Sequence, residues 1–204
     1  MILYVSTRSS SMAARFGLAL SGLRAEVREI GLRKGEGRKP AYLAVNPKGQ
    51  VPALVLDDGT VVTETPAILL ALGEMAPESG LIPQERVARW RVAEFMAWCC
   101  WQIPRGFQPG FAPHRFGPAP AEGEIQRMAL IRVEEALAYL DTQLEGRDWA
   151  VGQAPTAADC TIVLLTIFAG FLGVAPPDSL MAHRRRLFAL PALAATLEAE
   201  GFSA

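Results

Sequence analysis

The spacing of apolar residues changes near residue 80, and this change constrains the fold of the 204-residue chain more than any other feature. Before it, short apolar runs typical of strands alternate with helical spacing. After it, from Glu85 to Trp101 and from Glu122 to Leu144, apolar residues recur every three or four positions opposite charged ones, as in helices of a bundle. The chain is long enough for two domains, so we expect an α/β domain followed by an all-helical one.

The first part of the chain reads as a βαβ unit followed by a ββα unit. The expected strands are Ile2 to Val5, Val27 to Ile30, Val51 to Leu56 and Thr60 to Thr63. Ser10 to Gly22 has helical spacing and ends at a glycine. The Asp-Gly pair between the last two strands is a strong hairpin signal. Thr65-Pro66 then starts a helix, with threonine as cap and proline at the first helical position. This order is the plan of a thioredoxin-like domain.

We place the domain boundary where the strand signals cease, near Ala76 to Gly80. The predicted domains are residues 1–78, thioredoxin-like, and residues 85–204, all-helical, joined by a linker over residues 79–84. Within the second domain, Pro104 to Pro120 is dense in proline and glycine, which predicts no regular element. Because this long segment keeps three phenylalanines, we expect it to form a wall of an apolar pocket.

Composition excludes several classes of function. Half of the residues are hydrophobic and the formal net charge is −1, which is typical of a globular protein without a nucleic-acid partner. The first residues lack a secretory signal pattern, and the nearly apolar run from Cys160 to Val174 is too short for a membrane span. We therefore predict a cytoplasmic protein that does not contact a membrane.

Two local patterns in the helical part are interpreted as structural. Cys99, Cys100 and Cys160 have neither a CxxC pair nor metal-ligand spacing, so we read them as small buried hydrophobes and predict no metal site. Thr156-Ala157-Ala158-Asp159 precedes an apolar helix and has the form of a capping box.

Taken together, four segments resemble the cytosolic glutathione transferases, and within them most closely the bacterial beta class. They are Met1-Ile2-Leu3-Tyr4 running into Ser10-Ser11, Asn46 to Leu54 (NPKGQVPAL), Asp57 to Thr60 with Thr63-Glu64-Thr65, and Gly152-Gln153 with the capping box. The resemblance covers nearly the whole chain. It implies a homodimeric detoxification enzyme that conjugates the glutathione thiolate to small apolar electrophiles, with glutathione as co-substrate.

The resemblance also implies a glutathione site in the first domain. A cis bond between Val51 and Pro52 would present the Val51 backbone to an extended tripeptide. Thr65, at a helix N-terminus, would hold the α-carboxylate of the γ-glutamyl group, and Glu64 would accept from its amino group. Lys34 would face the glycyl carboxylate. A plain helix-capping role for Thr65 is the alternative.

The catalytic prediction rests on the serine run at the start of the first helix. The reaction needs a thiolate, and a hydroxyl donor near a helix N-terminus favours that form. Ser10 stands where the beta class has cysteine, so we predict Ser10 and its neighbour Ser11 as donors to the thiolate. The alternative is that one serine merely caps the helix.

The second domain departs from the beta class at Pro104-Arg105, where that class has a histidine and a lysine. The predicted substrate pocket is formed by Trp101, Arg105, Phe107 and Phe111.

Two other functions stay open. A zeta-like, glutathione-dependent isomerase is suggested because Arg8-Ser9-Ser10 resembles the Ser-Ser-Cys motif of that class. A binding or interaction protein of the same fold that has lost catalysis is the other, because a fold does not dictate a function.

Overall fold

The computed structural model describes residues 1–202, and these divide into two compact units. The first unit comprises Met1–Arg89 together with the C-terminal residues from Phe188 onward, and the second is Trp90–Leu187. The α/β architecture of the first unit and the helical architecture of the second are as expected from the sequence. The units are not consecutive in the chain, however, because the C-terminal segment returns to the first unit.

The first unit contains a four-stranded sheet in the order β2-β1-β3-β4. Strand β1 (Ile2–Val5) pairs in parallel with β2 (Glu26–Glu29) and antiparallel with β3 (Ala53–Val55), which pairs antiparallel with β4 (Val61–Thr63). A parallel pair needs a crossover connection, and helix α1 (Ser11–Ser21) provides it. The predicted strands and hairpin are confirmed, with β3 and β4 shorter than expected.

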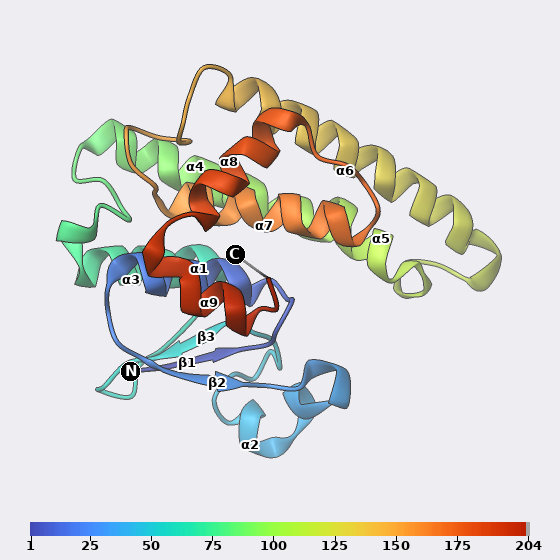
Figure 1. Ribbon diagram of the computed structural model, residues 1–204. Coiled ribbons are helices and arrows are strands. Elements are labelled where there is room, and N and C mark those ends of the chain that lie inside the picture. Colours follow the sequence, from blue (N-terminus) through green and yellow to red (C-terminus); the bar gives the residue numbers. More distant parts are fainter. Residues whose placement is uncertain (203–204) are drawn as a thin grey trace. The chain divides into compact units, whose positions relative to one another are not determined.

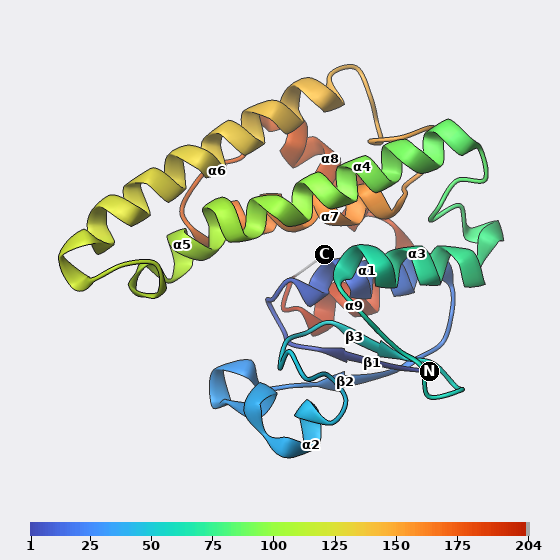
Figure 2. The ribbon, with the colours of Figure 1, turned by 180° about the vertical axis from the view of Figure 1, so that it is seen from behind.

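Helices cover one face of this sheet. Figures 1 and 2 show α1 and α3 (Thr65–Met75) on that face, with α9 (Ala194–Ala199) beside α1, and α2 (Pro40–Leu43) on the other side. Helices α1 and α3 pack closely because Gly17 has no side chain: a Cβ there would lie 2.1 Å from Leu69 Cδ2. Short 3₁₀ turns in this unit are Leu32–Lys34, Glu36–Arg38, Pro77–Ser79 and Pro191–Leu193.

The second unit is a bundle of helices. They are α4 (Arg86–Gln102, in this unit from Trp90), α5 (Gln108–Phe111), α6 (Glu122–Leu144), α7 (Ala157–Phe171) and α8 (Asp178–Phe188, in this unit to Leu187). Every residue of α7 from Ala157 to Ala169 is buried, and α7 begins with the predicted capping box. Between residues 1 and 202, no helix is both long and apolar enough to cross a membrane.

The proline-rich segment differs from its prediction. Helix α4 is followed without a break by a π-helical turn (Ile103–Phe107) and then α5, and 3₁₀ turns follow at Pro113–Arg115 and Ala119–Ala121. Proline lacks an N–H and its ring clashes with the preceding turn of an α-helix. A π turn changes the hydrogen-bond ladder locally, so Pro104 is accommodated at the point where the α-helical pattern already ends.

Two of the three cysteines are buried, as predicted from the sequence. Cys99 and Cys160 are buried and Cys100 is partly buried. Burial raises the pKa of the Cys99 and Cys160 thiols well above the ordinary value, and a thiol held protonated is a poor nucleophile. Within the described residues, no group of three or more metal-ligating side chains gathers.

Candidate functional site

The serine run at the start of α1 has three different environments. The Ser9 hydroxyl accepts from the Ser11 N–H at 3.2 Å and lies 2.8 Å from the Ser11 hydroxyl. Ser11 is 0% exposed, and its hydroxyl accepts from Ser6 N–H at 3.0 Å and donates to Ser6 O at 3.1 Å. Ser11 therefore ties the loop before α1 together from inside the protein.

Ser10 is free of that network. It is the N-cap residue of α1 but makes no side-chain capping bond, so the capping alternative does not describe it. Its partly buried hydroxyl lies 3.5 Å from the Val51 carbonyl oxygen. A donor at that distance is held only weakly. The tertiary structure thus places the weakly hydrogen-bonded hydroxyl of Ser10 beside the backbone of Val51.

The segment before Val51 is held by its own side chains. The Gln50 carbonyl accepts from Tyr42 Oη at 2.6 Å and from Asn46 Nδ2 at 2.7 Å. Gly49 has φ +66°, and a Cβ there would lie 2.6 Å from Gly37 O, so the loop requires glycine at this position. The Val51–Pro52 bond is cis, as the resemblance implied.

The start of α3 is an open helix N-terminus. Thr65 is the first helical residue and Glu64, with φ +72°, is the N-cap; the predicted arrangement, with Thr65 as cap and Pro66 first, is therefore wrong by one residue. Thr65 is 7% exposed, and its hydroxyl has no hydrogen-bond partner among the residues that the structure describes. A helix N-terminus with a spare hydroxyl suits a carboxylate.

A lysine that the sequence analysis did not select lies at this helix start. Lys48 Nζ donates to Thr63 Oγ1 at 2.9 Å and forms an ion pair with Glu64. The Glu64 carboxylate is mostly exposed, so this pair is weak and exchangeable. Lys34, the predicted lysine, is exposed in a 3₁₀ turn, and across residues 1–202 no hydrogen bond or ion pair joins it to Val51, Glu64 or Thr65.

The predicted substrate-pocket residues have unlike surroundings within the second unit. Phe107 is fully buried, with its ring 6.0 Å from that of Phe168, and Phe111 stands edge-on to Phe168 at 5.6 Å. Trp101 is 60% exposed and Arg105 is also exposed. The two phenylalanines thus share a cluster, and Phe107 contributes to the core rather than to a surface.

A buried glutamate from the C-terminal end supports the loop that carries Ser10. Glu200 is 0% exposed; its carboxylate accepts from the Arg8 N–H at 2.7 Å and from Arg15 Nη1 at 2.7 Å. Arg8 has φ +57°, a conformation that non-glycine residues adopt rarely and that neighbouring structure must hold. Nothing in the sequence distinguishes Glu200 from the exposed Glu198, so this residue was missed.

We expect Glu200→Gln to lower the free energy of unfolding by about 1.5–3 kcal/mol, the contribution of a hydrogen bond to a charged group. The amide offers one acceptor oxygen where two are used, and it leaves the Arg15 guanidinium without a counter-ion. Urea unfolding measures the change, with Glu198→Gln as the matched control, expected within about 0.5 kcal/mol of the parent chain. Equal effects of both variants would show that the buried contacts contribute little.

Comparison with known proteins agrees with this geometry. The family models described as the N-terminal and C-terminal domains of glutathione S-transferase match residues 9–75 and 107–191. A glutathione S-transferase of Escherichia coli O157:H7 is 33% identical over 163 residues, covering 78% of each chain. A maleylacetoacetate isomerase of Pseudomonas aeruginosa is 32% identical over 180 residues, covering 86% of this chain and 84% of the relative.

Solved structures extend the likeness to the full length. A sphingomonad glutathione S-transferase complexed with glutathione superposes with a TM-score of 0.86 at 32% identity and covers 100% of both chains. This chain thus combines the sheet order, the cis Val51–Pro52 bond and the open start of α3 with matches to both family models. With relatives above 30% identity over most of its length, this chain belongs to the glutathione S-transferase family.

Proposed function

We propose that the protein binds glutathione along Val51 and Thr65 and conjugates its thiolate to small apolar electrophiles. The observation that carries the proposal is a pair of hydroxyls without strong hydrogen-bond partners among residues 1–202: Ser10 beside the Val51 carbonyl and Thr65 at the start of α3. Two relatives support the proposal. The Escherichia coli O157:H7 relative is a glutathione S-transferase, and the sphingomonad glutathione S-transferase was solved in complex with glutathione.

Each end of glutathione has a suited group in this unit. The backbone N–H groups at the start of α3 and the Thr65 hydroxyl would receive the γ-glutamyl carboxylate. The Glu64 carboxylate would accept a hydrogen bond from the γ-glutamyl amino group, which would replace Lys48 as its ion-pair partner. The Val51 backbone would pair with the cysteinyl residue as a short strand addition. We keep Lys34 as the partner of the glycyl carboxylate.

Ser10, and not Ser11, is the residue that we assign to the thiolate. The Ser11 hydroxyl is buried and both accepts from and donates to the Ser6 backbone, whereas among the described residues the Ser10 hydroxyl has one long contact. A hydroxyl donor lowers the pKa of a neighbouring thiol because it favours the charged form. The second unit would supply the electrophile pocket, for which Trp101, Arg105 and Phe111 remain our candidates. Phe107, also predicted for this pocket, is fully buried in the core.

Thr65→Val tests the carboxylate contact without changing side-chain volume. We expect glutathione to bind the wild type in calorimetry and to bind the variant about tenfold more weakly, the effect of losing one charge-assisted hydrogen bond. Thr142→Val, on the exposed surface of α6, is the matched control and should bind as the wild type does. Absence of both glutathione binding and turnover of a chlorodinitrobenzene in the wild type would overturn the proposal.

A zeta-like isomerase is the second candidate, and the observation that favours it is the isomerase relative from Pseudomonas aeruginosa at 32% identity. Glutathione-dependent isomerisation of maleylacetoacetate without conjugation of the chlorodinitrobenzene would select it. Glutathione binding with neither reaction would select a carrier or interaction protein of this family. We further propose that the protein is cytoplasmic and forms a homodimer. Sedimentation of the purified chain would test the oligomeric state.

A further inference from the structure

We propose that Glu200 is a positioning residue for Ser10, so that the C-terminal segment of the chain takes part in activating glutathione. Within the proposed function, on which this inference rests, the Ser10 hydroxyl donates to the thiolate of glutathione. Glu200 directly follows helix α9, which lies beside α1 (Figures 1 and 2). The glutamate acts on the serine through the loop between β1 and α1.

Two carboxylates hold the backbone of that loop. The Thr7 N–H donates to Glu29 Oε1 at 2.6 Å. The next amide, the Arg8 N–H, donates to Glu200 Oε2 at 2.7 Å. Glu29 is exposed, whereas Glu200 is 0% exposed. A hydrogen bond is stronger in the protein interior than at the surface, where water competes for it, so the buried carboxylate has the greater control of the path toward Ser10.

The same carboxylate joins the loop to the body of α1. Glu200 Oε1 accepts from Arg15 Nη1 at 2.7 Å, while its second oxygen accepts from the Arg8 N–H. Arg15 belongs to α1, and its side chain is only 11% exposed. Because the two oxygens are fixed relative to each other, the position of Arg8 is tied to the helix whose N-cap is Ser10. Loss of either contact would release the loop from the helix.

The backbone of Arg8 needs such a hold. Its φ is +57°, and a residue other than glycine disfavours this left-handed region by about tenfold. Arg8 lies two positions before Ser10, so a return to negative φ would redirect the chain that carries the serine. The Ser10 hydroxyl would then leave its place 3.5 Å from the Val51 carbonyl oxygen, because no other contact among residues 1–202 holds it there.

The C-terminal segment is itself anchored on α1. The Phe202 ring lies 5.5 Å from that of Phe188, which stands edge-on to Phe16 of α1 at 6.1 Å. Gly201 has φ +75°, and a Cβ there would lie 3.3 Å from Arg8 Nη2. This position therefore favours glycine, and the arginine side chain lies against the end of the segment. The buried glutamate between these anchors has a fixed place beside the loop.

The test titrates the thiol of bound glutathione, by its ultraviolet absorbance, in the wild type and in Glu200→Gln. The amide has one acceptor oxygen for two donors, so it cannot hold both Arg8 and Arg15. With the Arg8 conformation then disfavoured about tenfold, we expect the pKa of bound glutathione to rise by about 0.5 to 1 and kcat/KM at neutral pH to fall about threefold to tenfold. S-methylglutathione, which has no thiol to ionise, should bind both proteins equally.

A second background shows whether the glutamate acts through the serine. In Ser10→Ala the donor is already absent, so adding Glu200→Gln should raise the pKa of bound glutathione no further. A direct effect of the lost charge would instead lower this pKa in both backgrounds, because removal of a nearby anion favours the thiolate. That result, or an unchanged pKa in Glu200→Gln alone, would overturn the proposal.

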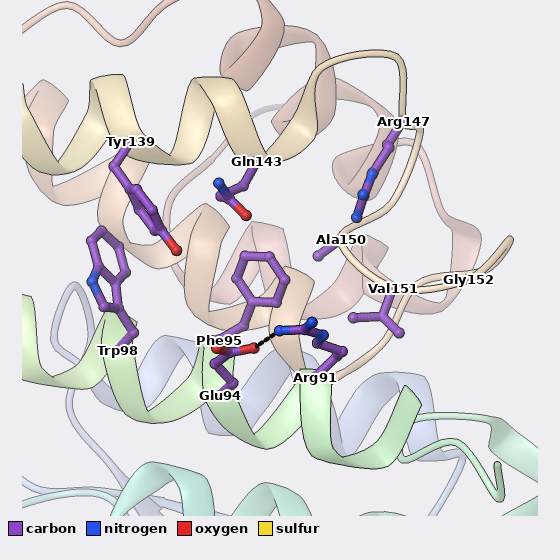
Figure 3. Close-up of a pocket in the computed structure, with 10 residues that line it drawn as sticks. All are labelled: Arg91, Glu94, Phe95, Trp98, Tyr139, Gln143, Arg147, Ala150, Val151 and Gly152. Atoms are coloured by element: carbon purple, nitrogen blue, oxygen red, sulfur yellow. Dashed lines mark hydrogen bonds and ion pairs between the residues drawn. The ribbon is translucent and has the colours of Figure 1, made fainter. Parts of the chain in front are cut away.

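The control variant is Glu94→Gln, which removes a carboxylate from an arginine pair in the second unit. Figure 3 shows this pair, in which Arg91 Nη1 lies 2.7 Å from Glu94 Oε2. The titration of bound glutathione should not change in Glu94→Gln, and a shift equal to that in Glu200→Gln would contradict a specific role for Glu200.

Hydrogen exchange of the wild type tests the hold on the loop without any variant or ligand. The Arg8 amide should be protected about tenfold more than the Thr7 amide, because its acceptor is buried. Lower protection at Arg8 than at Thr7 would overturn the proposal. A wild type that does not bind glutathione would overturn the proposed function and the role of Glu200 together. Binding with a thiol pKa that depends on Ser10 and not on Glu200 would overturn the role of Glu200 alone.

Discussion

Replacing Ser10 by alanine is expected to lower kcat/KM for conjugation at neutral pH by about tenfold to a hundredfold. The lost hydrogen bond to the thiolate contributes about 1.5–3 kcal/mol, and each 1.4 kcal/mol corresponds to a factor of ten. The Ser10 hydroxyl lies beside Val51 and has no strong partner in the part of the chain that the structure describes, so the variant should fold as the wild type does. The loss should therefore appear in catalysis and not in the free energy of unfolding.

The pH dependence identifies the mechanism of that loss. A hydrogen bond to a charged group contributes about 1.5–3 kcal/mol, and each pKa unit corresponds to about 1.4 kcal/mol, so we expect the pKa of bound glutathione to rise by about 1 to 2 in Ser10→Ala. Above both pKa values the thiol is ionised in either protein, and the two rates should converge. The ultraviolet absorbance of the bound thiolate measures the titration directly.

Two serine variants serve as controls for this prediction. Ser10→Thr keeps a hydroxyl and should restore most of the thiolate titration. Ser11→Ala removes a buried hydroxyl that bonds to the Ser6 backbone, so it should reduce stability and leave the pKa of bound glutathione near the wild-type value. An unchanged titration in Ser10→Ala would exclude Ser10 from the mechanism.

Replacing Asp159 by alanine is expected to lower the free energy of unfolding by about 3–5 kcal/mol, the cost of removing one member of a buried polar pair. Asp159 is 0% exposed and its two oxygens accept four contacts. Oδ1 accepts from Ala150 N–H at 2.8 Å and lies 2.7 Å from His183 Nε2. Oδ2 accepts from Thr156 N–H at 2.7 Å and Thr156 Oγ1 at 3.0 Å.

The cost is large because every partner is left inside the helical unit without an acceptor. His183 would lose the most, since its other ring nitrogen, Nδ1, is buried and already has no hydrogen-bond partner within residues 1–202. Asp159→Asn should be nearly as damaging as Asp159→Ala, because its amide keeps one oxygen and turns a donor toward groups that are themselves donors. Urea unfolding of the two variants measures both effects.

A control variant at an exposed aspartate and a double variant test whether the loss of stability comes from the buried contacts of Asp159. Asp148→Asn removes an exposed ion pair with Arg186 and should change stability by less than about 1 kcal/mol. In a double-mutant cycle, Asp159→Ala and His183→Ala should be non-additive by about 1–3 kcal/mol, because the second change removes the stranded partner of the first. Additive effects would contradict the assigned coupling between the two side chains.

Features set by neighbouring residues could be predicted from the sequence. The β3–β4 hairpin follows from Asp58, whose carboxylate accepts from the Thr60 N–H at 2.8 Å, and from Gly59 at φ +86°. The start of α7 follows from the capping box, whose two side chains, Thr156 and Asp159, are three positions apart. In both cases the groups that decide the geometry lie within a few positions of each other, so their spacing alone indicates the structure.

The proline-rich segment shows where a local rule was insufficient. Its proline and glycine content predicted an irregular loop, but the chain continues as the π turn Ile103–Phe107 and α5. The Phe107 ring packs near that of Phe168, and burial of this kind contributes about 1.5–3 kcal/mol per large apolar side chain. Pro104 and Pro109 each stand in the first turn of their element, where a missing N–H costs little, so packing of Phe107 was enough to favour the helical path.

The sequence by itself determined the two architectures, the order of the strands along the chain, the cis Val51–Pro52 bond through family resemblance, and the candidate residues Ser10, Glu64 and Thr65. Only the tertiary structure decided which serine is available, because Ser11 and Ser10 differ in their contacts and not in their chemistry. The same holds for Glu200, which reaches Arg8 across 192 positions of sequence. A side chain's partner at such separation depends on how α9 packs beside α1, and no pattern of neighbouring residues encodes that packing.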